Sequence, residues 1–220
     1  MVTKSIALLV CDTPIPEVVA EHGEYPGIFT ELMQKSLPEG SEDWDFKLDA
    51  YDVVTKMEYP SEDEIESYDA FMYTGSAASA YANIEWIHKL ISFTAHLVKD
   101  HPKIKIFAIC FGHQIVSLAL GGNCVKNKGK WEVGPTKLRL TDVGTELFGI
   151  GDQITIQEMH QDHVPFVPKG FHLLASTNVS LNQGMLSTIG TEYQFTPSLE
   201  SRVIDPPSSS PRPSPHLLFH

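Results

Sequence analysis

The chain has 220 residues, of which 42% are apolar and 20% charged, with a formal net charge of −12. This is ordinary for a globular protein with one sizeable core. The acidic excess argues against a nucleic-acid partner, because phosphate binding rests on Lys and Arg. No apolar run approaches the roughly 20 residues that span a bilayer, and the run at 6–11 is too short for a signal-peptide core. We therefore expect a cytoplasmic protein that handles small molecules or other proteins, without a membrane.

The first predicted elements alternate between strand and helix. A continuous apolar run at 6–10 predicts a strand buried on both faces of a parallel sheet. Pro14 and Pro16 then predict a loop. Apolar residues at helical spacing predict a helix over 27–37, and loose alternation at 44–54 predicts one or two short strands.

The middle of the chain carries the strongest signals. A short apolar strand is predicted at 70–73, and Asn83 is predicted to cap a helix whose apolar stripe runs over 86–98. Residues 103–109 give the strongest strand prediction in the chain, and a helix predicted over 112–120 follows it without a loop. A Gly-Gly pair closes that helix.

Beyond this point the predicted strands at 137–140, 153–157 and 172–175 indicate an antiparallel extension of the sheet. The fold class is therefore α/β, a mostly parallel central sheet with helices on both faces. We predict a folded domain over 1–205. Residues 206–220 contain five Pro and four Ser, which predicts a disordered tail.

Cys110 stands where the strongest strand turns directly into a helix. Such a turn forces a strained backbone on the corner residue and exposes its side chain. The positive end of the helix favours a thiolate there, and the amide of Phe111 can donate to an oxyanion. Gly112 is expected because a Cβ would crowd the preceding strand. The other two cysteines, Cys11 and Cys124, lack this context, and three unpatterned cysteines indicate reduced thiols.

The segment Ala-Ile-Cys-Phe-Gly-His-Gln at 108–114, followed by a helix ending in Leu-Gly-Gly, resembles the nucleophile motif of class I glutamine amidotransferases. It is most similar to standalone proteins like the glutaminase domain of GMP synthetase. The segments at 73–81, 131–134, 159–164 and 182–185 resemble other parts of the same family. This resemblance covers about residues 4–205 and implies the flavodoxin-like fold of the family, without a cofactor.

The resemblance also implies roles. Cys110 would attack the amide carbon of glutamine, form a γ-glutamyl thioester and release ammonia. The oxyanion and substrate-binding positions would be Gly75, Ser76, Phe111, Gln114 and His160.

The family pattern breaks near the C-terminal end. The family carries Gly-His-Pro-Glu-Phe-Thr there, and in our alignment Glu192 replaces the His and Gln194 replaces the Glu. A strand and loop before this motif are shortened. A carboxylate beside the thiol would raise the pKa of the thiol, so Glu192 is not expected to act as the base. The shortened segment and the tail are also typical of a misread exon boundary or frameshift.

Three histidines near the predicted site are alternatives for the missing base. His113 is expected to point away from the thiol, whereas His160 and His163 fall in the expected pocket loop. A metal site is not predicted, because no second ligand cluster accompanies these two. Four further histidines are expected to be exposed: His22, His88, His96 and His101.

Three functions remain open. The first is an enzyme that hydrolyses glutamine or a γ-glutamyl amide through Cys110 and serves a biosynthetic pathway, with a separate ammonia-accepting enzyme as partner. The second is a non-catalytic homologue that binds a ligand or a partner. The third is a peptidase that cleaves γ-glutamyl conjugates by the same thioester chemistry.

Overall fold

The computed structural model describes residues 2–37, 40–41 and 43–188, and the backbone of 192–195. The strands are β1 (Val2–Val10), β2 (Trp44–Asp52), β3 (Ala70–Tyr73), β4 (Lys105–Ala108), β5 (Val125–Lys126), β6 (Glu132–Leu140), β7 (Gln153–His160), β8 (Asp162–His163), β9 (Phe171–Ser176), β10 (Gly184–Ser187) and β11 (Glu192–Phe195). The helices are α1 (Pro16–His22), α2 (Tyr25–Ser36), α3 (Glu62–Ile65), α4 (Glu85–Asp100), α5 (Phe111–Ala119) and α6 (Asp142–Phe148).

The described strands form a nine-stranded sheet in the order β2-β1-β3-β4-β11-β10-β9-β6-β7, and β5 pairs with β8 separately. The pairs from β2 to β11 are parallel. The pairs from β11 to β7 are antiparallel. The predicted α/β class and the antiparallel extension of the sheet are confirmed.

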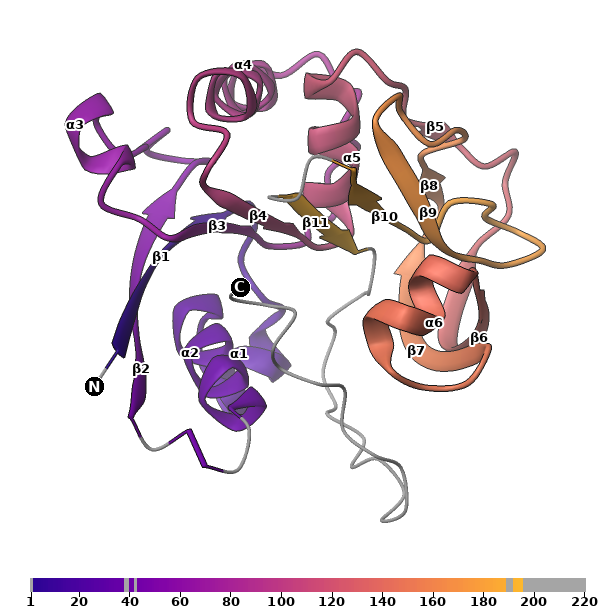
Figure 1. Ribbon diagram of the computed structural model, residues 1–220. Helices are drawn as coiled ribbons and strands as arrows, with labels where there is room; N and C mark the ends of the chain where they lie inside the picture. The colour runs from indigo at the N-terminus through magenta and orange to yellow at the C-terminus, as the bar shows by residue number, and fades with distance from the viewer. Residues whose placement is uncertain (1, 38–39, 42, 189–191, 196–220) are drawn as a thin grey trace.

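Helices cover both faces of the parallel half (Figure 1), with α4 and α5 on one face and α1 and α2 on the other. The alternation of side chains along β1 feeds two cores. Leu9 packs in the core that α4 and α5 cover, where Trp86 and Phe111 lie. Leu8 packs in the opposite core with Phe29 of α2. Burial on both faces explains why β1 is apolar without interruption.

Several local predictions were wrong. Pro16 does not lie in a loop but begins α1, because proline suits the first helical position, where no amide donor is needed. Asn83 does not cap α4, whose N-cap is Ile84; the side chain of Asn83 instead contacts the ring of His88 at 2.8 Å. By contrast, the prediction of one or two strands over 44–54 is confirmed, because residues 44–52 form the single strand β2, which pairs in parallel with β1 along its whole length.

The end of α5 follows the prediction. The helix stops at Leu120, and the next residue, Gly121, has a φ of +76°, a conformation that glycine adopts without strain. Among the described residues, no helix has the length and apolar content needed to cross a bilayer. The predicted tail at 206–220 lies outside the described residues.

Candidate active site

Cys110 lies at a sharp corner between β4 and α5. Its backbone has φ 50° and ψ −103°, and it is the N-cap of α5. A side-chain-bearing residue in this region costs about 1–3 kcal/mol, which the surrounding packing has to offset. The thiol is only partly buried. The predicted corner at Cys110 therefore exists, with the thiol at the amino end of a helix.

Gly112 permits the close approach of α5 to the sheet. A Cβ on Gly112 would lie 2.5 Å from Cβ of Tyr73 and 3.4 Å from Cβ of Ala108. The crowding expected from the sequence therefore comes mainly from the neighbouring strand β3, and only secondarily from β4. Glycine at this position sets how closely the corner packs on the two strands.

The segment after β3 meets this corner. A Cβ built on Gly75 would lie 3.7 Å from Cβ of Cys110. Because β3 and β4 are adjacent and parallel, their carboxyl ends lie at one edge of the sheet, and the two loops meet there. The structure thus brings Gly75 and Cys110 together, as the resemblance implied.

Asp12 holds the loop that follows β3, a role that sequence reasoning missed. Its carboxylate accepts a hydrogen bond from the Ala77 amide at 2.7 Å and one from the Ser76 hydroxyl at 3.2 Å. In the same loop, Thr74 Oγ1 accepts from the Cys11 amide at 2.9 Å. The available signal was position: Asp12 follows β1 at the same edge of the sheet as Gly75 and Cys110.

Asp162 joins several segments around the corner, and the sequence alone assigned it no such role. Its carboxylate accepts hydrogen bonds from Ser79 at 2.5 Å and Tyr81 at 3.0 Å. Its backbone carbonyl accepts one from Gln114 Nε2 at 3.2 Å, and Nδ1 of His160 lies 3.1 Å from the same oxygen. Asp162 therefore connects the loop after β3, helix α5 and the end of β7.

His160 is a buried ion-pair partner in a strand, whereas the sequence predicted it in a pocket loop. It ends β7, and its Nε2 lies 3.4 Å from Glu132 and 3.3 Å from Glu158. Burial opposes a charge on the ring, but the two carboxylates outweigh it and raise the pKa of His160 to about 10. Both ring nitrogens thus face groups other than the thiol, which argues against His160 as the base that activates Cys110.

The two carboxylates around His160 differ in environment. Burial favours the neutral form of Glu132, but the charged His160 ring and the hydrogen bond from Thr177 outweigh that effect and lower the pKa of Glu132. Thr177 and Gln183 each donate to Glu132 at 2.6 Å. Glu158 has no such donors among the described residues, and burial raises its pKa. Nothing in the sequence indicated this pair of carboxylates, because only the pairing of β6 with β7 brings Glu132 and Glu158 together.

The other two candidate bases, His113 and His163, have different environments. His113 is 1% exposed, and neither ring nitrogen has a hydrogen-bond partner within the described part of the chain. Burial, aided by the charge on His160, lowers the pKa of His113 to about 3, so the ring is neutral at pH 7. His163 lies in β8 and is partly buried, and burial lowers its pKa as well.

Strand β11 contains Glu192 and Gln194, the two residues that replace the His and Glu of the family. Strand β11 runs parallel to β4, with Glu192 opposite Ile106 and Gln194 opposite Ala108. Glu192 is therefore level with a residue four positions before Cys110, or ~13 Å back along the strand at about 3.3 Å per residue. Their side chains lie outside the described residues.

Cys11 and Cys124, which lack the sequence context of Cys110, are buried thiols. Cys11 is 1% exposed and Cys124 is 3% exposed. Burial raises the pKa of each thiol to about 12. At neutral pH both are therefore protonated.

The prediction that His96 and His101 are exposed was wrong. His101 caps the end of α4 and is 8% exposed, and His96 is partly buried. Both rings face Glu62 of α3, and these three side chains are the group among the described residues whose ligand atoms converge closely enough to hold a metal ion. His22 and His88 are exposed as predicted.

Sequence comparisons identify the family. Residues 39–194 match the model of the glutamine amidotransferase class-I family. A glutamine amidotransferase-like protein of Schizosaccharomyces pombe is 39% identical over 78% of this chain and 69% of its own length. Gamma-glutamyl peptidase 3 of Arabidopsis thaliana is 30% identical over 80% of this chain and 68% of its own length.

The solved structures support the fold. The crystal structure of a glutamine amidotransferase from Thermotoga maritima superposes with a TM-score of 0.65, covering 87% of this chain and 74% of that one at 16% identity. At this identity the likeness shows the fold alone. The family follows from the sequence match, which spans the corner at Cys110 and the loop after β3. The chain belongs to the class I glutamine amidotransferase family.

Proposed function

We propose that the protein hydrolyses glutamine or a γ-glutamyl amide through a thioester on Cys110. The observation that carries this proposal is the strained backbone of Cys110 at the amino end of α5, packed against the loop at Gly75. The thiolate attacks the side-chain amide carbon, and the C–N bond breaks as the leaving nitrogen takes a proton. Water then cleaves the thioester, which releases glutamate and regenerates the thiol.

Backbone amides at the corner supply the oxyanion site in this proposal. The first amides of a helix have no acceptor within the helix, so the Phe111 amide is available at the amino end of α5. The amides near Gly75 and Ser76 belong to the loop that packs against Cys110. Asp12 holds this loop through two hydrogen bonds, which supports a fixed set of donors.

Gln114 and His160 contribute to the substrate pocket by position. Both contact the backbone carbonyl of Asp162, and the Asp162 carboxylate connects to the loop after β3. A substrate bound over the corner at Cys110 would be enclosed by these three segments. We therefore assign Gln114 and His160 to substrate positioning and not to proton transfer.

The identity of the leaving amine distinguishes two forms of this function. Gamma-glutamyl peptidase 3 of Arabidopsis thaliana aligns with most of this chain. The same thioester chemistry therefore serves as well for a γ-glutamyl peptide, whose leaving group is larger than ammonia. Comparing release rates from glutamine and from γ-glutamyl dipeptides decides between the two.

The replacement of the family His and Glu favours a second candidate, a homologue that binds ligand without turnover. Losing a catalytic base lowers turnover by about four to six orders of magnitude. The register of β11 adds to this, because Glu192 lies level with Ile106 and not with Cys110. In this form the corner and its amides would still bind a γ-glutamyl group.

The decisive experiment measures glutamate and ammonia release from glutamine by the full chain and by Cys110→Ala. Cys11→Ala is the matched control, because Cys11 is a buried thiol with a pKa of about 12. We expect release by the wild type and by Cys11→Ala, and none above background by Cys110→Ala. Equal rates for wild type and Cys110→Ala reject the hydrolase, and calorimetric binding of glutamine to that inactive chain then supports the binding homologue.

The cellular setting is part of the proposal. The three cysteines are free in the structure, which supports a reducing compartment such as the cytosol. If ammonia is the useful product, its acceptor is a separate biosynthetic enzyme. Copurification of an ammonia-consuming synthetase activity with the tagged full chain tests this partner.

A further inference from the structure

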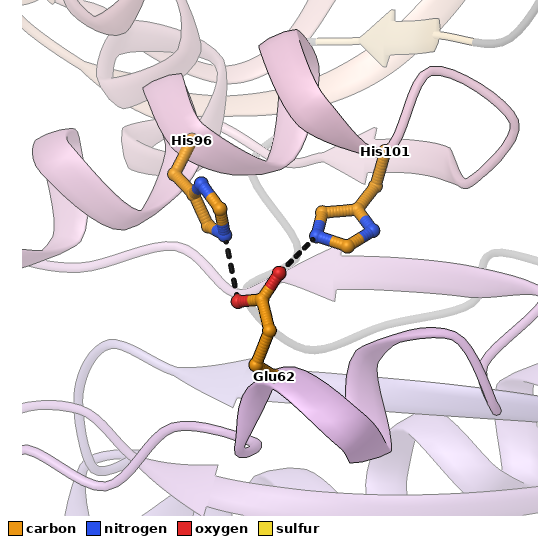
Figure 2. Close-up of side chains that lie close together, drawn as sticks. All are labelled: Glu62, His96 and His101. Carbon is orange, nitrogen blue, oxygen red and sulfur yellow. Dashed lines mark hydrogen bonds and ion pairs between the residues drawn. The ribbon is translucent and has the colours of Figure 1, made fainter.

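Three side chains from two helices converge on one point, near the edge of the sheet opposite to Cys110. Glu62 begins α3, His96 lies in the last turns of α4, and His101 ends that helix (Figure 2). Nε2 of His96 lies 2.9 Å from one oxygen of Glu62, and Nε2 of His101 lies 3.0 Å from the other. The three ligand atoms all lie within 4.8 Å of one another.

The outer nitrogens of both rings are also fixed by carboxylates. Nδ1 of His96 lies 2.8 Å from Asp100, and Nδ1 of His101 lies 2.6 Å from Glu66. A carboxylate on the far nitrogen orients the ring and directs the lone pair of Nε2 toward a metal in many zinc sites. Here both histidines have that arrangement, and both direct Nε2 toward the same Glu62.

The charges around the two rings call for a cation. Three carboxylates, those of Glu62, Glu66 and Asp100, surround two imidazoles. Each ring contacts one carboxylate through Nδ1 and shares Glu62 with the other ring through Nε2. A divalent cation between the two Nε2 atoms and Glu62 would be attracted by these carboxylates and coordinated by all three side chains.

We propose that Glu62, His96 and His101 bind a divalent transition metal of the zinc type. Two imidazole nitrogens and one carboxylate are a set that zinc accepts, with metal–ligand distances of roughly 2.0–2.2 Å and a fourth position open to water. Those distances place tetrahedral ligands ~3.4 Å apart. Glu62 is the most exposed of the three ligands, so its carboxylate can adjust to close the site.

The location suggests a structural role. Glu62 precedes β3 and His101 precedes β4, whereas Gly75 and Cys110 follow those strands. The metal would therefore lie at the opposite edge of the sheet from the thiol and join α3 to the end of α4. Because α3 has only four residues, a metal link there would stabilise a segment with little helix of its own. This proposal does not depend on the chemistry at Cys110.

The test is calorimetric titration of the chelator-treated full chain with Zn²⁺, together with the visible spectrum of Co²⁺ bound in its place. We expect one tight equivalent and a tetrahedral Co²⁺ spectrum without thiolate charge-transfer bands. Cys110→Ser should keep both properties, which separates this site from metal bound to the thiol. Absence of Zn²⁺ binding, or its loss in Cys110→Ser, overturns the proposal.

Variants with matched controls locate the site. Glu62→Gln and His96→Gln should each weaken Zn²⁺ binding by about 100-fold or more, since each removes a direct ligand and even outer-sphere changes cost about 10–100-fold. Asp63→Asn and His88→Gln are the controls, because they change exposed residues of the same two helices outside the cluster. Unchanged affinity in both ligand variants, with circular dichroism reporting a native fold, overturns the assignment of these residues.

A thermal readout checks the structural role. Saturating Zn²⁺ should raise the Tm of the wild type and of Asp63→Asn, and should leave the Tm of Glu62→Gln unchanged. A rise of equal size in all three proteins would contradict the proposed link between α3 and α4.

Discussion

Replacing Gly112 by Ala tests the packing that shapes the corner at Cys110. The new Cβ would lie 2.5 Å from Cβ of Tyr73, about 1 Å closer than the favourable carbon–carbon distance. Tyr73 is fully buried, and its hydroxyl forms a 3.0 Å hydrogen bond with Thr94, so the strand has little room to yield. Helix α5 must therefore move away from β3.

The magnitude follows from two opposing effects. Overpacking of a dense core costs about 1–3 kcal/mol, and this contact belongs at the upper end because both atoms are Cβ atoms on fixed backbone. Alanine in place of glycine in a helix returns about 1 kcal/mol. The net loss of ~2 kcal/mol in the free energy of unfolding corresponds to a Tm lower by about 4–8 °C for a chain of this size.

The matched control is Gly27→Ala, also in the first turn of a helix. A Cβ on Gly27 of α2 meets nothing within 4 Å, so this change should raise the free energy of unfolding by about 0.5–1 kcal/mol. Urea unfolding followed by circular dichroism measures both variants. If Gly112→Ala were as stable as Gly27→Ala, the close contact between α5 and β3 would not constrain the corner, and the reasoning would be wrong.

Three further predictions concern thiols and buried histidines. Iodoacetamide at pH 8 should modify Cys110 in the folded protein and leave Cys11 and Cys124 unmodified, because a thiol with a pKa of about 12 is only ~10⁻⁴ ionised at pH 8. Peptide mass spectrometry identifies the modified cysteines. Labelling of Cys11 or Cys124 before Cys110 would contradict the accessible position of Cys110. The folded-state pKa of His113 is about 3, so the unfolded chain binds that proton first and stability falls between pH 6.5 and pH 3. When the pH is lowered from 7.5 to 5, the free energy of unfolding of His113→Met should therefore fall by about 2 kcal/mol less than that of the wild type. An equal fall in both proteins would refute a buried neutral ring at His113. His160 has a raised pKa of about 10, so its pairing stabilises the fold fully below pH 6.5 and less as pH rises through 10. His160→Gln should cost about 3–5 kcal/mol at pH 6 and less at pH 10, whereas a cost that grows with pH would refute the ion pair.

The linear order of motifs was enough to predict the fold class and the corner at Cys110. Both depend on local pattern: an apolar run gives a strand buried on two faces, and a strand that meets a helix without a loop gives a strained turn. Gly112 was also predictable, because a glycine two residues after Cys110, in the first turn of the helix, indicates close packing on the sheet. Errors came where local rules compete, as at Pro16, which serves equally well in a loop or at the start of a helix.

Contacts between distant segments were decided by tertiary structure alone. Asp12 lies in no motif, and the family resemblance assigned no role to Asp162. Sheet topology nevertheless sets Asp12 beside the loop at Gly75, and Asp162 links that loop to α5 and β7. The same holds for Glu62, His96 and His101, which read as scattered surface residues until α3 packs beside the end of α4. Sequence spacing encodes geometry only within one helix or strand, whereas a site assembled from several elements depends on strand order and register.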